Sequence, residues 1–516
     1  MKNFVYSQPT EIVFGAGTHQ EIGQRLEPIA RRVLLVYGGH SAQKSGLLDR
    51  VRRALEASGI YYRELGDIHP NPRLAPVEAG IDLVRRENLE GLLAVGGGSV
   101  IDTTKAIAAG APYPGEVWDF FCGKATPQQC LPVVTLLTIP AAGSEASDSC
   151  VLTREQDDRP IKKGFHTPLL RPRLSILDPT LTYTLPAYQT AAGGVDIMAH
   201  VLERYFTREA DVDLSDRLCE AVLRTVIAHL PRALEQPDDY SARAQLMWAG
   251  TLAHNDLLSA GRIGDWASHT IAHQPSALYD MTHGAALAIV LPAWMKYVYR
   301  HDVARFARFA VRVWGVEDDF AAPEKTALEG IRRTETFFAS LGLPTCFSHT
   351  DIPYSSFGKM ADLATANGSQ TIGHFVELTR DDVYEIYPLA QCPLPPMKTV
   401  RCGFSPSAPA PASRRCSAGR TSTRVSSTRP SIPGGRTLPR PSLLATAWNT
   451  PSPIWNKPPA ATPSTRRTSP RPTRCISHKR CSCSPTENTC SAKNPWLPTP
   501  GRRDSCAAPP KKKGSY

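Results

Sequence analysis

The amino-acid sequence predicts an α/β domain with a parallel sheet over residues 1–184, an all-helical domain over 185–390 and a disordered tail over 391–516. Three observations support this division. Short apolar runs alternate with glycine turns and helical patterns in the first part. In the second part, apolar residues recur at helical spacing and strand signals are sparse. Apolar periodicity stops in the third part, where the composition also changes.

Three short apolar runs in the first part predict buried strands. They span 33–37, 92–95 and 133–138, and they end in small-residue turns at 38–39, 96–99 and 140–144. Residues 45–58 show helical periodicity after the first turn. Strand, turn and helix in repetition indicate a parallel sheet covered by helices. Ligands on such sheets bind at the carboxyl ends of the strands, where these turns fall.

The second part reads as a succession of helices. The predicted helices span 187–208, 214–232, 241–260, 264–279 and 284–299, separated by turns and by Pro231. We therefore expect a cleft between an α/β part and a helical part.

The tail differs from the rest of the chain in composition. It holds 22 of the 59 lysines and arginines, 23 of the 46 prolines and 8 of the 13 cysteines, but its acids are limited to Glu487 and Asp504. The formal charge of +11 thus divides into +20 for the tail and −9 for residues 1–390. Such a segment cannot bury enough apolar surface to offset the entropy of ordering, and we expect it to be disordered.

Two interpretations of the tail remain. A strongly basic segment can bind nucleic acid nonspecifically. Arginine, proline, serine and threonine without pattern are also typical of an out-of-frame translation of a GC-rich gene, which is the interpretation we favour. Removing the tail would weaken RNA or DNA binding at low salt under the first interpretation and leave it unchanged under the second.

Residues 1–390 have the features of a cytoplasmic protein. They are mildly acidic and contain five scattered cysteines, which suits a reducing compartment. The sequence contains no run of 18 apolar residues, so it does not indicate a membrane span. The first residues lead into a strand-like segment without the apolar core of a signal peptide.

Four residues in the helical part have the chemistry of a metal site. Asp196 and His200 are four positions apart in a helical pattern, so their side chains share one helix face. His269 and His283 supply two further imidazoles. Each histidine taken singly is more often an ordinary partly buried side chain. Three imidazoles and one carboxylate together suit one Fe²⁺ or Zn²⁺ ion better than Mg²⁺ or Ca²⁺.

The glycine turns are of a nucleotide-binding type, although a lone glycine triplet is common. Backbone N–H groups in a turn such as Gly96-Gly97-Gly98-Ser99, followed by a helix, favour a pyrophosphate. The turn Gly38-Gly39-His40-Ser41 contains no acid. An acid there would hydrogen-bond the ribose 2′-hydroxyl and repel a 2′-phosphate, so the sequence favours NADP(H) over NAD(H).

Several separated motifs resemble one known family. Residues 96–105, GGGSVIDTTK, are similar to the GGGSxxDxxK signature of the iron-containing alcohol dehydrogenases, and 193–206 and 265–297 resemble their metal-binding helices. The resemblance covers about residues 1–390 and is strongest to the NADPH-dependent butanol dehydrogenase and aldehyde reductase branch. It implies a Rossmann-like N-terminal domain, a helical C-terminal domain as in dehydroquinate synthase, a metal in the cleft between them, and a homodimer.

The resemblance also implies roles for individual residues. The metal ligands are Asp196, His200, His269 and His283. The cofactor-binding residues are Gly38, Gly39, Ser41, Gly96, Gly97, Gly98, Ser99, Asp102, Thr138, Ser144 and Lys162. Asp102 lies in the first turn of its helix, where it contacts cofactor hydroxyls or, alternatively, only complements the helix dipole. His273, one turn after His269, is the catalytic candidate, either as a proton relay or as a residue that orients a ligand or a water molecule.

The predicted activity is reversible hydride transfer between NAD(P)H and a small aldehyde or alcohol. One alternative is other chemistry on the same scaffold, such as dehydroquinate-synthase-like elimination, which requires several basic residues near the histidines that are not evident. Another is a nucleic-acid-binding protein with an inactive enzyme domain, although nothing in binding alone requires four intact metal ligands.

Overall fold

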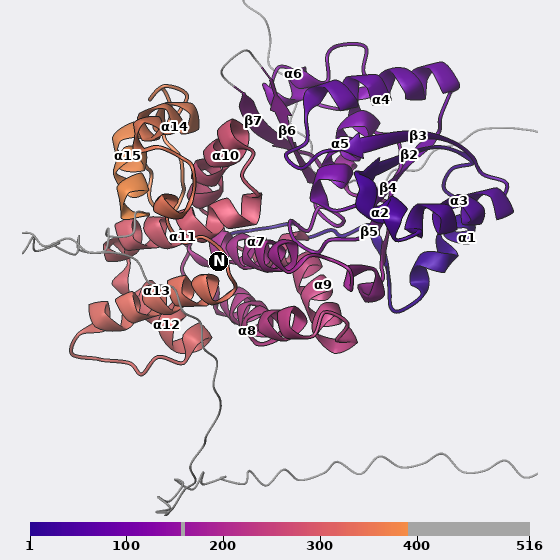
Figure 1. Ribbon diagram of the computed structural model, residues 1–516. Coiled ribbons are helices and arrows are strands. Elements are labelled where there is room, and N and C mark those ends of the chain that lie inside the picture. Colours follow the sequence, from indigo (N-terminus) through magenta and orange to yellow (C-terminus); the bar gives the residue numbers. More distant parts are fainter. Residues whose placement is uncertain (156–159, 391–516) are drawn as a thin grey trace, which may run out of the picture. The chain divides into compact units, whose positions relative to one another are not determined.

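The structure is a computed structural model that describes residues 1–155 and 160–390, all within one compact unit (Figure 1). The predicted tail at 391–516, with its predicted disorder, lies outside the described residues.

The first part of the chain forms a six-stranded parallel sheet in the order β1-β8-β5-β4-β2-β3. Its strands are β1 (Glu11–Phe14), β2 (Arg32–Gly38), β3 (Tyr61–Ile68), β4 (Gly91–Gly96), β5 (Val133–Leu137) and β8 (Leu174–Leu177). The three predicted strands are confirmed as β2, β4 and β5, which lie in the interior of the sheet. An antiparallel hairpin, β6 (Ser149–Arg154) and β7 (Ile161–His166), stands beside the sheet and was not predicted.

Helices cover both faces of the sheet (Figure 1). They are α1 (Ile22–Leu26), α2 (His40–Lys44), α3 (Leu47–Ala57), α4 (Leu74–Glu87), α5 (Gly98–Gly110) and α6 (Trp118–Phe121). Along β2, Leu34 and Val36 belong to a cluster with α4 and α5, whereas Val33 and Leu35 belong to a cluster with α1 and α3. Alternating side chains explain why a strand buried on both faces reads as a continuous apolar run.

The second part is helical, as predicted. Its helices are α7 (Ala187–Tyr205), α8 (Asp213–Glu235), α9 (Tyr240–His254), α10 (Ala267–Tyr279), α11 (His283–Val298), α12 (Val303–Trp314), α13 (Pro323–Ser340), α14 (Phe357–Ala364) and α15 (Arg380–Leu389). The five predicted helices correspond to α7–α11. The expected break at Pro231 is wrong, because α8 continues to Glu235. The predicted domain boundary at 184/185 falls between β8 and α7 and stays a proposal.

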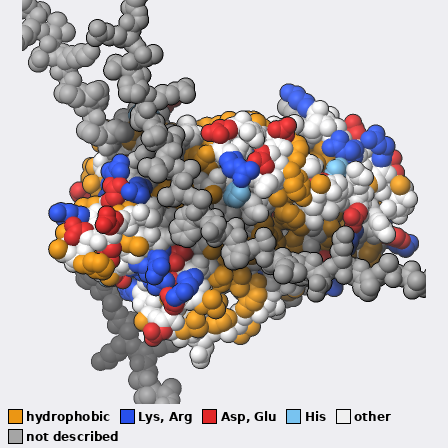
Figure 2. Space-filling view, turned by 90° about the horizontal axis from the view of Figure 1, so that it is seen from below, with side chains coloured by type: hydrophobic (Ala, Val, Ile, Leu, Met, Phe, Trp, Pro, Cys, Tyr) orange, Lys and Arg blue, Asp and Glu red, His pale blue; other side chains and the backbone are white. Residues whose placement is uncertain are grey.

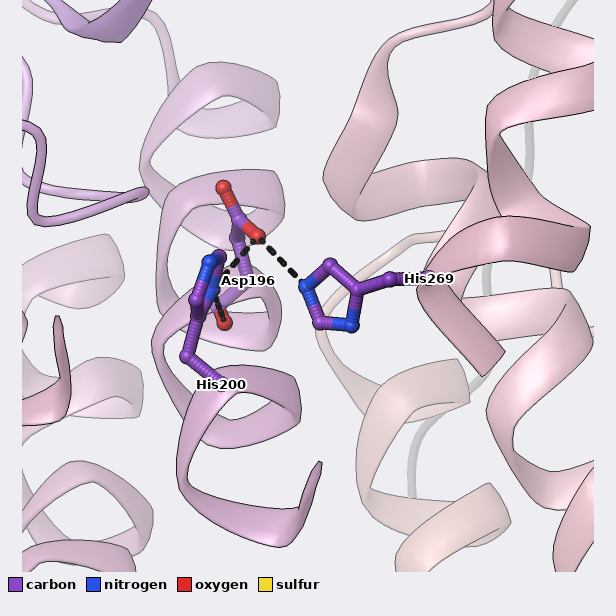
Figure 3. A group of neighbouring side chains, drawn as sticks. All are labelled: Asp196, His200 and His269. Atoms are coloured by element: carbon purple, nitrogen blue, oxygen red, sulfur yellow. Dashed lines mark hydrogen bonds and ion pairs between the residues drawn. The ribbon is translucent and has the colours of Figure 1, made fainter. Parts of the chain in front are cut away.

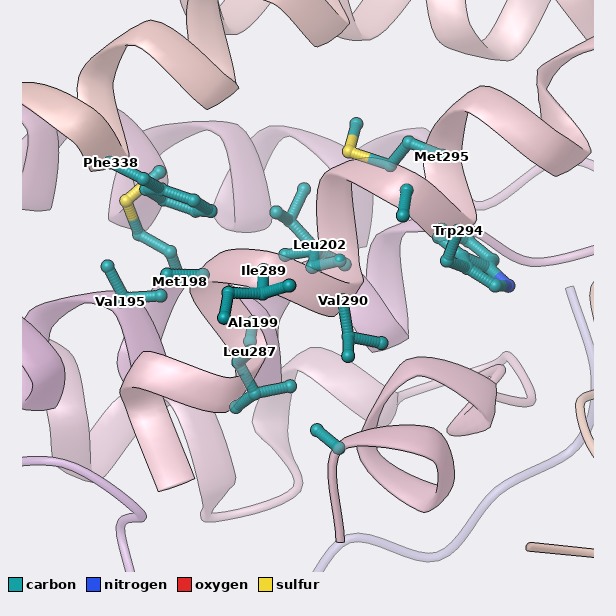
Figure 4. Packing of buried hydrophobic residues seen from close by; sticks show 14 of the residues in the cluster. Val195, Met198, Ala199, Leu202, Leu287, Ile289, Val290, Trp294, Met295 and Phe338 are labelled. Carbon is teal, nitrogen blue, oxygen red and sulfur yellow. The ribbon is translucent and has the colours of Figure 1, made fainter. Parts of the chain in front are cut away.

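One face of α7 anchors the helical core. Val195, Met198 and Leu202 are fully buried and belong to one apolar cluster with Leu287 and Val290 of α11 (Figure 4). Burying each such side chain contributes about 1.5–3 kcal/mol. Because this face holds α7 in place, the side chains on its other face are presented in fixed positions.

The face of the molecule drawn in Figure 2 carries both basic and acidic side chains, which lie side by side with apolar patches between them. Within residues 1–155 and 160–390, no helix is both long and apolar enough to cross a membrane.

Candidate active site

A cleft of about 850 Å³ lies between the carboxyl ends of the strands and helices α7, α10 and α11. Every site residue predicted from the sequence lines this cleft. Along α7 the lining positions include Gly193, Asp196, His200 and Arg204, which share one helix face. The cleft therefore follows α7 from the nucleotide-type turns toward the C-terminal end of that helix.

Asp196, His200 and His269 form a group that can hold a metal ion, with candidate ligand atoms all within 4.8 Å of one another (Figure 3). Asp196 Oδ1 lies 3.1 Å from Nδ1 of His200 and 4.0 Å from Nε2 of His269. His200 Nδ1 also lies 2.9 Å from the backbone oxygen of Asp196, to which it donates in the neutral tautomer. Its Nε2 is then left as the acceptor that a cation needs.

Unpartnered polar atoms support this assignment. Asp196 Oδ1 and His269 Nε2 are buried and make no hydrogen bond in the described part of the chain. Such groups are costly to leave unsatisfied, and a cation would pair with both of them. The donor set therefore fits a divalent iron or zinc ion.

His283 lies at the margin of this group. Its Nε2 is 3.9 Å from Asp196 Oδ1, and its ring centroid is 5.3 Å from that of His269. The first turn of α11 can approach α7 this closely because residue 284 is glycine. A Cβ at Gly284 would lie 1.9 Å from the backbone oxygen of Ala192. The structure thus places His283 beside the three-residue group, and its role as fourth ligand stays a proposal.

Glu203 of α7 supports His269, and our sequence analysis did not identify it. Its Oε1 accepts hydrogen bonds from Nδ1 of His269 at 2.7 Å, from the backbone N–H of His269 at 3.0 Å and from Ser268 Oγ at 2.6 Å. Oε2 accepts from the backbone N–H of Trp266. Burial raises the pKa of Glu203, whereas these donors favour its ionised form. The bond to Nδ1 directs Nε2 of His269 toward Asp196.

Burial also sets the protonation of the histidines. The pKa values of His254, His269, His273 and His283 lie well below the ordinary value, chiefly because burial disfavours the charged imidazolium. Neutral imidazoles can act as metal ligands or proton acceptors.

The nucleotide side of the cleft is shaped by small residues before and at the start of α5. A Cβ at Gly97 would lie 3.0 Å from Ile139 Cβ, and one at Gly98 would lie 3.3 Å from Ala142 Cβ. The absence of side chains leaves the backbone N–H groups of the first turn accessible to a phosphate. These residues fit a dinucleotide at the strand ends.

Asp102 departs from the sequence prediction in one respect. Because α5 begins at Gly98, Asp102 lies beyond the first turn, which contains no acid. Its two oxygens accept hydrogen bonds from Ser144 Oγ at 2.6 Å and from the backbone N–H of Val151 at 3.0 Å. Asp102 therefore connects α5 to the loop after β5 and to the hairpin, while still lining the cleft.

Two lysines border the same region. Lys105 is fully buried and donates to the backbone oxygens of Ser147 and Ser149 at 2.8 and 3.0 Å. Lys162 donates to Asn71 Oδ1 at 2.9 Å. Burial lowers the pKa of each lysine to about 8. Lys105 supports the loop beneath the cleft, whereas Lys162 lines it.

His254 and Arg204 also line the cleft without having been predicted. The ring centroid of His254 is 4.5 Å from that of His200. Arg204 is 1% exposed, and its guanidinium carbon is 4.8 Å from the centroid of the Trp266 ring. Helical spacing after His200 could have drawn attention to Arg204. Nothing local to His254 indicates that the end of α9 meets this cleft.

A parallel α/β sheet with glycine turns and an Asp-His-His group facing the same cleft define a metal-dependent, nicotinamide-linked oxidoreductase. Comparison with known proteins specifies the class. Residues 9–179 match the iron-containing alcohol dehydrogenase model, and residues 190–390 match the C-terminal model of the Fe-containing alcohol dehydrogenase family. The chain belongs to the iron-containing alcohol dehydrogenase family.

Similar proteins extend over nearly the same residues. A probable NADH-dependent butanol dehydrogenase of Bacillus subtilis is 43% identical over 386 residues, covering 75% of this chain and 99% of that protein. The NADPH-dependent aldehyde reductase YqhD of Escherichia coli is 37% identical, covering 76% and 100%. The crystal structure of NADH-dependent butanol dehydrogenase A from Thermotoga maritima matches with a TM-score of 0.73 at 40% identity, covering 76% and 99%.

Proposed function

We propose that this chain reversibly transfers hydride between NADP(H) and a small aldehyde or alcohol. The observation that carries the proposal is that the Asp196-His200-His269 group and the glycine turns line one cleft. A divalent iron or zinc ion held by these residues and His283 would polarise the carbonyl oxygen, and the nicotinamide would supply the hydride. The chain itself binds both partners, orients them and supplies the route for the proton.

A direct test uses the full-length chain, stripped of metal and reconstituted separately with Zn²⁺ and Fe²⁺. Absorbance of NADPH and NADH is followed with butanal as substrate. We expect metal-dependent oxidation of NADPH. No turnover with either cofactor, despite bound metal and a folded chain, would rule out this function.

We infer that His273 accepts and returns the proton of the substrate hydroxyl. It lies one turn after His269 on α10, its ring centroid is 5.3 Å from that of His283, and it lines the cleft. Burial keeps its pKa well below the ordinary value, so the imidazole is neutral and can accept a proton.

His273→Ala should lower kcat by about a hundredfold, because a positioned proton acceptor contributes at least that factor. Metal content, measured by atomic emission on the same samples, should stay unchanged. Loss of metal in this variant would instead make His273 a ligand or a structural residue.

The preference for NADP(H) is supported by the acid-free turn after β2 and by the position of Lys162. Gly38 pairs with Ile68 at the end of β3, and Asn71, three residues later, accepts the hydrogen bond from Lys162. Lys162 itself belongs to β7 of the hairpin, and its ammonium would pair with a phosphate of the bound cofactor. Relatives of both cofactor preferences exist, so the ratio of kcat/KM for NADPH and NADH is the deciding measurement.

The affinity for NADPH should fall as the pH rises through the pKa of Lys162. Because that pKa is lowered to about 8, the charge is present below pH 8 and lost above it. The KM for NADPH should rise about tenfold from pH 7 to pH 9, since a hydrogen bond to a charged group contributes about 1.5–3 kcal/mol. Lys162→Met should have the high KM at both values. Lys163→Met, at the exposed neighbouring position, should behave like the unchanged protein.

We also propose, from the family resemblance, that the chain acts as a cytoplasmic homodimer. Static light scattering of the purified protein tests the dimer, and cell fractionation tests the location.

A further inference from the structure

A second cavity, of about 310 Å³, borders the cleft at Asn71, which lines both. Its other walls include Thr153 of β6, Ser276 of α10 and Asp280 at the end of α10. The strand register places Thr153 opposite Lys162, which lines the cleft, so these two side chains are on the same face of the hairpin. This cavity, which we call the side chamber, therefore adjoins the cleft on its hairpin side.

Helix α10 connects the proposed catalytic histidine to the side chamber. Ser276 follows His273 by three residues and Ala277 follows it by four, so both lie one turn further along the same helix face. His273 lines the cleft, whereas Ser276 and Ala277 line the side chamber. One face of α10 therefore passes from the metal group at His269, through His273, into the side chamber.

Two hydroxyl groups of the side chamber have no protein partner. Thr153 Oγ1 and Ser276 Oγ are buried and make no hydrogen bond to residues 1–155 or 160–390. The two residues are only 5% and 0% exposed. Buried polar groups are normally hydrogen-bonded, to ordered water where no protein atom is available. The chamber has room for several water molecules, since each takes about 30 Å³ in the liquid. Water in the chamber would satisfy both hydroxyls.

The outer end of the side chamber is charged and reaches solvent. The side chain of Asp280 is 63% exposed and that of Arg73 is 40% exposed. Asp280 Oδ2 accepts a hydrogen bond from Arg73 Nη2 at 3.1 Å, and its Oδ1 accepts one from Nδ2 of Asn71 at 3.4 Å. The chamber thus runs from a buried hydroxyl, one helical turn from His273, to a carboxylate at the surface.

The proposed reaction needs such a route. Alcohol oxidation removes a hydride, which passes to the oxidised cofactor, and the hydroxyl proton, which passes to His273. A bound dinucleotide and substrate fill the cleft, so the proton has to leave His273 by a path that does not run through them. Hydroxyl groups and water both donate and accept hydrogen bonds, and a chain of them can therefore pass a proton on.

We propose that the side chamber is the proton exit of the enzyme. Water held by Ser276 and Thr153 carries the proton from His273 to Asp280 and the bulk solvent, and the reverse path supplies the proton for aldehyde reduction. This inference rests on the proposed function and on the role of His273. His273 regains its neutral form, and each water or hydroxyl gives up one proton for each that it accepts. Ser276 and Thr153 are positioning residues, because they order the water and do not touch the substrate.

The test compares, in the first turnover, the appearance of the proton in solution with the formation of NADPH. The metal-loaded full-length protein is mixed with NADP⁺ and 1-butanol in weak buffer, and the absorbances of phenol red and NADPH are followed together. In the unchanged protein the two signals should rise at equal rates.

The Thr153→Val/Ser276→Ala double variant should release the proton about tenfold more slowly than it forms NADPH. Proton transfer through positioned groups contributes about a hundredfold or more, and water retains part of the route. The ratio of kcat in H₂O to kcat in D₂O should rise in the same variant. A purely structural role of the two hydroxyls would move neither quantity.

The double variant should fold, because replacing an unpaired buried hydroxyl by an apolar group of similar shape is nearly neutral. Thr10→Val is the matched control. Thr10 is 6% exposed and its Oγ1 is also buried without a partner in the described chain, but it lines neither cavity. This control should release the proton in step with NADPH. If the double variant fails to fold, Asp280→Asn decides, because its side chain is mostly exposed and its loss of charge should cause the same delay.

Proton release in step with NADPH in the folded double variant, or in Asp280→Asn where that variant decides, would overturn the exit route while the alcohol dehydrogenase function stands. An equal delay in Thr10→Val would also overturn it, since the delay would then not depend on the side chamber. Formation of no NADPH by the unchanged protein, despite bound metal, would instead contradict the proposed function itself.

Discussion

His200→Ala is expected to abolish stoichiometric metal binding and to lower kcat/KM by at least about a thousandfold. The reason is that a metal ion stabilises alkoxide charge by several kcal/mol, and each 1.36 kcal/mol corresponds to a factor of ten. Metal per chain is measured by atomic emission and kcat/KM by NADPH absorbance. Because Asp196 and His269 remain, weak binding at high metal concentration should persist and restore part of the activity.

His229→Ala serves as the control for this substitution. His229 is a partly buried histidine of α8 that does not line the cleft. The His229→Ala variant should keep its bound metal and its activity. If the His200→Ala variant kept its full metal content and full activity, His200 would not be a metal ligand. The proposed arrangement of the metal site would then be wrong.

Glu203→Gln is expected to weaken metal binding about 10–100-fold while the protein still folds. Residues that orient a metal-binding histidine through its second nitrogen typically contribute this factor. Glutamine can still accept from His269, but its NH₂ group would face the N–H of Trp266, which now bonds to Oε2. An unsatisfied buried donor costs about 1–3 kcal/mol, so the free energy of unfolding should also fall.

Asp265→Asn separates loss of stability from loss of metal affinity. Asp265 is as buried as Glu203, and among the described residues it accepts hydrogen bonds from the backbone N–H groups of Ala267, His374 and Phe375 alone. The Asp265→Asn substitution should lower the free energy of unfolding without a comparable change in the metal dissociation constant, which is measured by competition with a chelator. Equal metal affinity in Glu203→Gln and in the unchanged protein would show that Glu203 only caps the start of α10.

The strands that the sequence predicted are buried and form long apolar runs. β2, β4 and β5 are interior strands buried on both faces, so their residues form continuous apolar runs. β8 is also interior and fully buried but was not predicted, because it has four residues and Ser175 interrupts its apolar run. β1 and β3 are edge strands with partly exposed residues, and their mixed patterns resemble those of loops. Helices α12–α15 were not predicted, although α12 buries Phe306 and Phe309 at helical spacing.

The candidate site divides in the same way. Glycine turns and the Asp196-His200 spacing are local patterns, and they predicted the nucleotide turns and the metal group before any tertiary information. His269 and His283 became specific through the family resemblance, since isolated histidines are common. The cleft that these residues line was expected from the alternation of sheet and helices, because ligands bind where parallel strands end.

By itself, the sequence determined the fold class, the family and the type of chemistry, because these depend on periodicity and on motifs a few residues long. The tertiary structure alone decided which side chains support and complete the site. Glu203 meets His269 across 66 positions of chain, and His254 meets Ala142 across 112. Such contacts form when separate elements pack together, and no local pattern encodes the distance between two helices.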